Sequence, residues 1–321
     1  MIKKQKPSIN GILKFFSNET KDDKYLLEWY NKYSYYYNFP DNMIKFISFD
    51  ENASINQSKL KSIEKNRIYL EKPQNFNDPF DGKYYIKYNN TIIKEENKIN
   101  TKKHEVYRVC CFQSFRKKNP MTNSILTNPQ MWSHYANWHN GICIQYYTDF
   151  VKYFATDPYG NFDMLKKENN LDYACRFFPM RYEKNMPFIN IDEYNRRKNK
   201  DDYIKQTVLK SIITKSKKWK EEDEYRLIVN IEKDKIKKEN GNYFYKAPPI
   251  KKIYLGVNLD KDIEKRLIKI ANEKYISLEK LIIKKDCYEL DIDCNNKRIN
   301  ELKNNLMLKE VFDKFKPNNA L

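Results

Sequence analysis

Three charged side chains stand at alternate positions where a polar segment of the chain runs into an apolar one. The stretch KKWKEEDEYRLIV contains Glu222, Glu224 and Arg226, and the next three residues are Leu, Ile and Val. In a β-strand, alternate residues point to one face of the sheet. Two carboxylates and a guanidinium on one face of a buried strand are costly unless they pair or act. A carboxylate fixed there could stabilise a developing positive charge, while a solvated sheet edge is the structural alternative.

The loop FNDPFDG, residues 76–82, is a second cluster of groups that could bind a ligand. It places Asn77, Asp78 and Asp81 between and after two phenylalanines. Side chains of this kind can contact a polar ligand, but Asx residues before proline also simply form turns. Both interpretations stay open at this point.

The stretch MWSHYANWHNGICIQYY, residues 131–147, is unusually rich in aromatic and histidine side chains. Just before it, Asn128 is typical of a helix cap and Pro129 of a first helical position. Gly141 is typical of a helix end. We therefore expect a buried helix over residues 129–139, apolar nearly all round.

His134 and His139 are five residues apart, about 140° around a helix. They cannot bind one metal ion as an H-x-x-x-H pair does. In one interpretation the helix is simply part of the core. In the other it is the wall of a pocket, with Trp132 and Trp138 as structure and with His134 and Tyr135 facing a ligand beside the FNDPFDG loop.

The elements that must position these groups follow from apolar periodicity. We expect, in chain order, strand 43–49, helix 54–65, strand 67–71, strand 106–115, strand 142–147, a short strand near Met180, helix 203–219, strand 224–232, strand 250–256, helix 259–274, strand 280–285 and helix 297–315. Lys45 is a charge inside the first of these strands. Strands mixed with helices predict an α+β or mixed α/β fold, a single domain with a mixed central sheet flanked by helices.

The two ends of the chain differ from the middle. Residues 20–39 carry an apolar helical stripe, formed by Leu26, Leu27, Tyr30 and Tyr33. We predict a helical appendage over residues 1–40, a core domain over residues 41–295, and a C-terminal helix and tail over residues 296–321.

A net charge of +18 could indicate a nucleic-acid-binding protein, but the types of basic residue that produce this charge weaken the indication. The chain has 51 Lys and only 10 Arg, and the lysines are spread along its whole length. A diffuse charge predicts only weak, salt-sensitive and sequence-independent nucleic-acid binding. Because Arg is rare here, each Arg is more informative than any Lys.

Cysteine usage and hydropathy indicate a location. The six cysteines form no C-x-x-C pair, so reduced thiols and a cytoplasmic protein are expected, without a zinc site. No apolar run reaches 18 residues and the first residues lack the features of a signal peptide, so we expect no membrane partner.

Taken together, these motifs resemble the bacterial domain-of-unknown-function 2971 (DUF2971) family. The matching pieces are IKFISF, RIYLEKPQNFNDPFDG, VCCFQSF, MWSHYANWHNGICIQYY, KSKKWKEEDEYRLIV and IKKIYLG. They occur in the order typical of that family and extend over roughly residues 43 to 292.

The layout is also similar, more loosely, to that of ADP-ribosyltransferases. Those enzymes carry a polar NAD-contacting residue on a first strand, then a second strand, then a catalytic Glu or E-x-E on a later strand. Lys45, Tyr69 and Glu222–Glu224 stand at the corresponding places, with Lys where Arg or His is usual. The resemblance implies NAD as substrate, no metal, and Glu224 as the catalytic carboxylate beside Glu222.

The contacts that this resemblance implies for NAD come from several parts of the chain. They are Lys45, Tyr69, Asn77, Asp78, His134, Tyr135 and Arg226. Arg226 could pair with a glutamate or hold a pyrophosphate by two parallel hydrogen bonds.

The expected function is therefore an ADP-ribosyltransferase-like enzyme that modifies a protein or a nucleic acid, by analogy as a toxin or a phage-defence effector. Two alternatives stay open. One is a nuclease that binds Mg²⁺ through Asp78, Asp81, Glu222 and Glu224. The other is a non-catalytic module that binds nucleic acid or protein.

Overall fold

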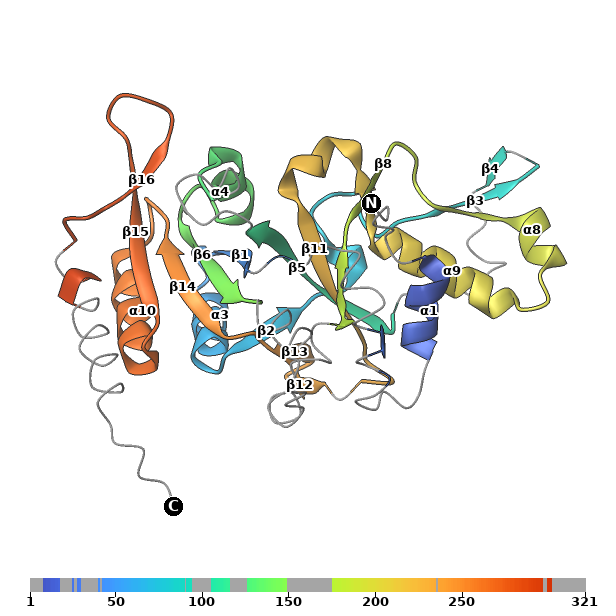
Figure 1. Cartoon of the computed structure of the whole chain (residues 1–321), viewed down its shortest axis with the longest axis horizontal. Coiled ribbons are helices and arrows are strands. Elements are labelled where there is room, and N and C mark those ends of the chain that lie inside the picture. Colours follow the sequence, from blue (N-terminus) through green and yellow to red (C-terminus); the bar gives the residue numbers. More distant parts are fainter. Residues whose placement is uncertain are drawn as a thin grey trace, which may run out of the picture. The chain divides into compact units, whose positions relative to one another are not determined.

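The computed structural model describes residues 8–17, 25, 28–29, 40, 42–89, 91–93, 105–115, 126–148, 175–234, 236–296 and 299–301 (Figure 1). The chain divides into two compact units, each assembled from three separate stretches. Unit 1 comprises residues 1–41, 69–114 and 148–245, and unit 2 comprises residues 42–68, 115–147 and 246–321. Because the two units alternate along the chain, no single cut in the sequence separates them.

Unit 2 is built on a mixed sheet with the strand order β16-β15-β14-β6-β1. Its elements are β1 (Asn42–Ser48), α3 (Ala53–Glu64), α4 (Pro129–Tyr135), β6 (Gly141–Tyr147), β14 (Ile250–Leu255), α10 (Lys261–Lys274), β15 (Ser277–Ile283) and β16 (Leu290–Ile292). The pair β14–β15 is parallel, whereas β14–β6, β6–β1 and β15–β16 are antiparallel. Helices α3 and α10 contact each other, and α4 packs on β1.

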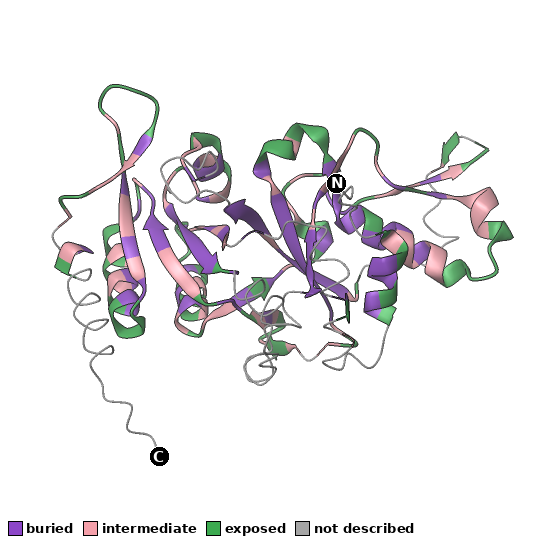
Figure 2. Cartoon of the chain, in the orientation of Figure 1, coloured by how far each residue is buried: buried purple, intermediate pink, exposed green. Residues whose placement is uncertain are grey.

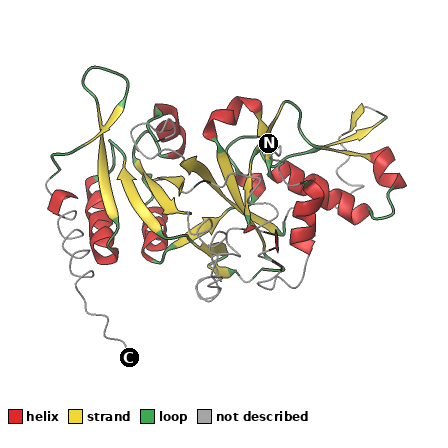
Figure 3. Ribbon diagram, viewed as in Figure 1, coloured by secondary structure: helices red, strands yellow, loops and turns green. Residues whose placement is uncertain are grey.

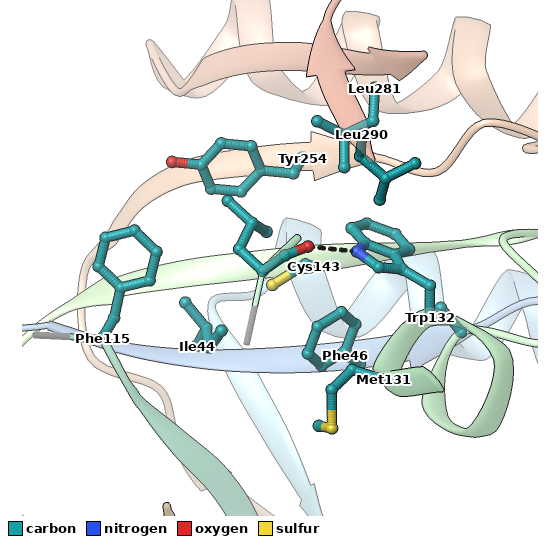
Figure 4. Packing of buried hydrophobic residues seen from close by; sticks show 11 residues of the cluster. Ile44, Phe46, Phe115, Met131, Trp132, Cys143, Tyr254, Leu281 and Leu290 are labelled. Carbon is teal, nitrogen blue, oxygen red and sulfur yellow. Dashed lines mark hydrogen bonds between the residues drawn. The ribbon is translucent and has the colours of Figure 1, made fainter. Parts of the chain in front are cut away.

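The core of unit 2 lies under α4 (Figure 4). The Trp132 side chain is fully buried, and its indole Nε1 donates a 2.6 Å hydrogen bond to the Leu126 carbonyl. Its ring meets Phe46 of β1 edge to face, with 5.1 Å between the centroids. Each buried aromatic side chain of this size stabilises the folded state strongly, because it removes a large apolar area from water.

The helix that begins at residue 129 ends earlier than expected. Asn128 caps it as predicted, because the Asn128 side chain accepts a hydrogen bond from the backbone of Gln130. However, α4 stops at Tyr135, and residues 136–139 form a turn rather than the rest of a helix to residue 139. Trp138, which we expected to be structural, is 73% exposed on this turn.

The backbone is closely packed on both sides of the turn that follows α4. A Cβ atom added to Gly141 would lie 2.5 Å from the Ile47 carbonyl oxygen. A Cβ atom added to Gly256 would lie 2.2 Å from the His139 carbonyl oxygen. Gly141 is the first residue of β6 and not a helix cap. Its lack of a side chain is what allows the backbone of Ile47 to approach so closely.

Unit 1 is built around β11 (Glu224–Asn230), which pairs with β5 (Tyr107–Phe115) on one side and β7 (Phe177–Pro179) on the other, both antiparallel. All seven residues of β11 are buried, and Figure 2 shows this strand and β5 largely in purple. β11 is thus an internal strand, and the solvated sheet edge considered for its charged residues is wrong.

The other elements of unit 1 surround these strands. They are α1 (Ile9–Ser17), η1 (Pro73–Asn75), β3 (Tyr85–Tyr88), β4 (Thr91–Ile93), β8 (Arg181–Glu183), β9 (Phe188–Asn190), α8 (Ile191–Arg196), α9 (Lys200–Ile212), β10 (Thr214–Ser216), η5 (Lys217–Glu222), β12 (Lys237–Glu239) and β13 (Asn242–Lys246). Helices α1 and α9 pack together (Figure 3). The short strand β2 (Arg67–Leu70) straddles the division between the units.

The helix expected over residues 203–219 is also shorter than predicted. It ends at Ile212, and the chain continues as the short strand β10, which pairs with β8 in parallel, and then as η5. The strand expected near Met180 is confirmed as β7 and β8 on its two sides.

The predicted helix 297–315 lies almost entirely outside the described residues, as does the apolar stripe predicted within residues 20–39. The predicted domain boundaries near residues 40 and 295 stay predictions. The expected fold class, helices with a mixed sheet in an α+β arrangement, is confirmed. Among the described residues, no helix has the length and apolar character that crossing a membrane requires. None of the six cysteines forms a disulfide bond.

Candidate functional site

A buried network of five charged side chains lies at the start of β11. The Lys215 ammonium of β10 contacts Glu222 at 2.6 Å and Glu224 at 3.1 Å. The second oxygen of Glu224 accepts a 2.7 Å hydrogen bond from Arg226 Nε. Arg226 then binds both oxygens of Asp81 in a bidentate pair, one of them at 2.8 Å. The network therefore runs from Glu222 through Lys215, Glu224 and Arg226 to Asp81.

Burial strengthens the electrostatic interactions between the charges of this network. Glu224 is 3% exposed and Arg226 is 0% exposed. Burial alone would raise the pKa of Glu224, but Arg226 and Lys215 outweigh it and lower that pKa to about 2. Burial likewise opposes the charge of Lys215, yet Glu224 and Glu222 raise its pKa above the ordinary value. Glu224 and Lys215 thus remain ionised at neutral pH.

Neutral groups complete the hydrogen bonding around the charged ones. Arg226 Nη1 donates to the Ile212 carbonyl oxygen at 2.5 Å, at the point where α9 ends. The Cys111 side chain hydrogen-bonds the Glu224 carboxylate. The backbone N–H of Glu224 donates a 2.9 Å bond to the Tyr182 hydroxyl. Burial, followed by the nearby charge of Glu224, raises the pKa of Tyr182.

Two aromatic rings lie against the cations. The Arg226 guanidinium carbon is 4.8 Å from the centroid of Phe76, and the Lys215 nitrogen is 5.0 Å from the ring centroid of Trp219. Both rings are half-buried. Contacts of this kind stabilise a cation further when it is desolvated.

The backbone brings Glu222 to the network in a way that a simple strand would not. Glu222 is the last residue of η5, and Asp223 turns the chain with a left-handed φ of 42°. Glu224 and Arg226 alternate on β11 as predicted, but Glu222 joins them because Lys215 bonds both glutamates. The expected convergence of Glu222, Glu224 and Arg226 therefore occurs, through a turn and a lysine rather than one strand face.

The loop residues of unit 1 have different surroundings. Asn77 is exposed, and Asp78 Oδ1 accepts a hydrogen bond from the Phe80 backbone, which is turn chemistry. Tyr69 on β2 is 42% exposed and meets the Phe244 ring at 5.9 Å. Of the FNDPFDG carboxylates, only Asp81 enters the network.

The remaining predicted contacts belong to unit 2. Lys45 is half-buried on β1, opposite Ile144 of β6. His134 is exposed on α4, and Tyr135 next to it is half-buried. These three residues stay predictions that rest on the resemblance.

Reasoning from the sequence missed Lys215, which completes the network. It stands among several lysines and was assigned to a helix, so its type and position gave no signal. Asp81 was considered as a ligand-contacting or turn residue of the FNDPFDG loop and as a metal ligand, but not as the partner of Arg226. Rare arginine gave the stronger signal, since Arg226 is the residue that binds both Asp81 and Glu224.

The carboxylates are engaged by protein cations. Within the ranges that the structure describes, no three His, Cys, Asp or Glu residues are grouped so that they could hold a metal ion. Both oxygens of Asp81 bond Arg226, and both oxygens of Glu224 bond Arg226 or Lys215. A metal at this place would have to displace both cations.

Comparison with known proteins finds one family. Residues 131–227 match the model of the family described as "Protein of unknown function (DUF2971)". No curated protein matches the chain, and no solved structure matches it. The matched residues include most of α4, its turn and the start of β11, together with the network residues Lys215, Glu222, Glu224 and Arg226 but not Asp81. The resemblance to the DUF2971 family is thus confirmed over residues 131–227.

Proposed function

We propose that the chain is an ADP-ribosyltransferase-like enzyme that uses NAD as substrate and modifies a protein or a nucleic acid. One observation carries the proposal. Among the described residues, the ion pairs of the network join three carboxylates, those of Asp81, Glu222 and Glu224, to two cations, Lys215 and Arg226. Counted over these five side chains alone, the network has three carboxylates and two cations, and all five side chains are buried.

Such a charge surplus suits a reaction whose transition state gains positive charge. In ADP-ribosyl transfer, the bond between the ribose C1′ and the nicotinamide nitrogen breaks, and its electron pair leaves with nicotinamide. A nucleophile of the acceptor forms the new bond to C1′ and loses its proton to solvent. The ribose passes through an oxocarbenium-like state, which fixed carboxylates stabilise by charge.

The proposed roles follow from the bonding of each residue. Glu224 supplies a carboxylate that stays ionised, and Glu222 supplies a second buried carboxylate, which Lys215 binds at 2.6 Å. Arg226 positions Glu224 through the pair that it makes, since binding a pyrophosphate would break its bonds to Asp81. Tyr69, Asn77 and Asp78 of the same unit remain proposed contacts for NAD.

The test is release of nicotinamide from NAD by the wild type and by Glu224→Gln. The substitution keeps the shape of the side chain and removes its charge, so turnover should fall by roughly 10²–10⁴-fold. Glu221→Gln is the matched control, because Glu221 is an exposed carboxylate three positions earlier that takes no part in the network. Circular dichroism should show both variants folded.

Two outcomes would overturn the proposal in different ways. A folded wild type that releases no nicotinamide with protein, RNA or DNA acceptors would exclude the transferase. Activity that survives Glu224→Gln would keep the reaction and discard this residue. Cleavage of DNA or RNA that EDTA abolishes would favour the nuclease, and sequence-selective binding at physiological salt without turnover would favour the binding module.

A role as a toxin or in phage defence is part of the same proposal. If the protein modifies an essential macromolecule of a bacterial cytoplasm, its expression should arrest growth, and Glu224→Gln should relieve the arrest. Growth that both forms arrest equally would show a toxicity unrelated to the network.

A further inference from the structure

Gln113 of β5 is buried with an amide oxygen that accepts no hydrogen bond from any residue the structure describes. It is 5% exposed, and within the described part of the chain its Oε1 atom has no hydrogen-bond partner. An amide oxygen that has left water and gained nothing costs roughly 1–3 kcal/mol. By contrast Gln145, equally buried at 3%, accepts a 3.0 Å bond from the Tyr254 hydroxyl. Gln113 is therefore an exception that calls for a physical reason.

The position of Gln113 supplies one. Gln113 stands directly opposite Glu224 in the antiparallel register of β5 and β11. Cross-strand partners of this kind leave the sheet on the same face, with Cβ atoms about 5 Å apart. Cys111, two residues earlier on the same face, hydrogen-bonds Glu224. The unpaired acceptor thus shares one sheet face with the buried carboxylate network.

The chemistry of this face selects what can bind there. The Gln113 Oε1 atom is an acceptor, and the adjacent network carries a surplus of carboxylates. A group that donates N–H bonds and carries positive charge satisfies both. An anion or a further acceptor satisfies neither, because it would meet like charge and an unpaired oxygen.

We infer that the face formed by Gln113 and Glu224 binds a cationic ring that carries a carboxamide, with the amide N–H₂ donating to Gln113. This inference rests on the proposed function, since the nicotinamide end of NAD is such a group: a pyridinium cation with a carboxamide. It makes Gln113 the residue that selects the amide, and the carboxylates the source of attraction for the ring.

The probe is 1-methylnicotinamide, and its binding to the full chain is measured by calorimetry. The matched ligand is 1-methylnicotinate, in which a carboxylate replaces the carboxamide while the ring is unchanged. The wild type should bind the first and reject the second. In Gln113→Met, which has a similar length and no hydrogen-bonding oxygen, binding of 1-methylnicotinamide should weaken by roughly 10²-fold or more.

Thermal unfolding separates recognition from simple packing. Gln113→Met removes an unsatisfied group, so its melting temperature should equal or exceed that of the wild type. The control is Gln145→Met, which breaks a satisfied buried bond in unit 2 and should lower the melting temperature while binding stays unchanged. If Gln113→Met keeps its stability and binds 1-methylnicotinamide as weakly as predicted, then Gln113 acts in ligand binding and not in packing.

The contrary results are distinct from failure of the transferase. If the wild type does not bind 1-methylnicotinamide, or if Gln113→Met binds it equally well, the inference is wrong, and a buried water is then the partner of Gln113. Binding without any release of nicotinamide from NAD would keep this inference and remove the proposed reaction. If Gln113→Met leaves the release of nicotinamide from NAD unchanged, the proposed reaction is kept and the inference about Gln113 is removed.

Discussion

The network at the start of β11 and the turn after α4 both contain features that cost free energy, but they compensate that cost in different ways. In unit 1 the cost is buried charge, and each charged atom of Arg226 and Glu224 meets a partner of opposite sign. In unit 2 the cost is backbone conformation. Asn137, Trp138 and His139 have φ values of 43°, 54° and 68°, all in the left-handed region.

The turn is held by sterics and backbone bonds rather than by charge. The backbone N–H groups of Trp138 and His139 donate to Ser133 and Trp132, and the Asn258 side chain donates to the Trp138 carbonyl. The network at β11 therefore depends on ionisation, whereas the turn after α4 depends on shape. Substitutions and pH should therefore affect them differently.

The largest effect is expected where one partner of the buried network is removed. Arg226→Leu leaves Asp81 buried without its cation and leaves Glu224 with Lys215 alone, so the free energy of unfolding should fall by about 3–5 kcal/mol. Arg266→Leu is the control, because Arg266 pairs with Glu64 at 3.9 Å on the surface and should cost less than about 1 kcal/mol. Urea denaturation measures both, and equal losses would show that the network contributes nothing special.

Unit 2 contains one buried and one exposed tryptophan, whose replacement should affect stability very differently. Trp132→Ala removes a fully buried side chain and should cost about 3–5 kcal/mol. Trp138→Ala removes an exposed side chain only six residues later, and surface changes usually stay within about 0.5 kcal/mol. Comparable losses from the two variants would mean that the indole of Trp138 is buried in solution.

Acid should weaken the network in a defined window. The pKa of Glu224 lies at about 2, below its ordinary value of 4.5, so the stability from its charge is fully present above pH 4.5. It is lost as the pH falls from 4.5 towards 2, by about 3 kcal/mol in total at roughly 1.4 kcal/mol for each pH unit. Glu224→Gln should flatten this part of the unfolding free energy against pH. An acid limb of unchanged slope would contradict the pairing.

His139 gives unit 2 a different pH window. Burial lowers the pKa of His139, whose ring stacks on Trp132, so stability from its neutral form is lost as the pH falls below its ordinary value of 6.5. His139→Gln should remove that dependence below pH 6.5, measured by urea denaturation at several pH values, and leave the acid range of Glu224 unchanged.

The smallest effect tests strain in the turn. Glycine adopts a left-handed φ without a Cβ clash, whereas alanine does not. Trp138→Gly should therefore be more stable than Trp138→Ala by about 1 kcal/mol, measured by the same denaturation. The reverse order would show that the φ of 54° at Trp138 is not strained.

Local signals in the sequence predicted much of the fold. Asn128 and Pro129 mark the start of α4 correctly, and the apolar run before Gln113 marks β5. The ends of α4 and α9 were misjudged because tertiary contacts decide them. The turn after Tyr135 packs closely against Gly256, and Arg226 bonds the Ile212 carbonyl oxygen at the end of α9.

The site was predictable only as far as residue type carried information. Alternation placed Glu224 and Arg226 together, and Arg226 was conspicuous because arginine is rare in this chain. The sequence could not show that Lys215 links Glu222 to Glu224, since a three-residue strand among lysines has no pattern. Nor could it show that Gln113 lacks a partner, which depends on the register of two strands far apart in the chain.

The third carboxylate of the network, that of Glu222, should serve function rather than folding, and Glu222→Gln separates the two roles. This substitution balances the network at two carboxylates and two cations and keeps an oxygen near Lys215. Nicotinamide release from NAD and urea denaturation are measured on the same preparations. We expect unchanged or higher stability together with a loss of turnover of roughly 10²-fold or more. Lower stability with unchanged turnover would contradict it, because the charge of Glu222 would then serve only the fold.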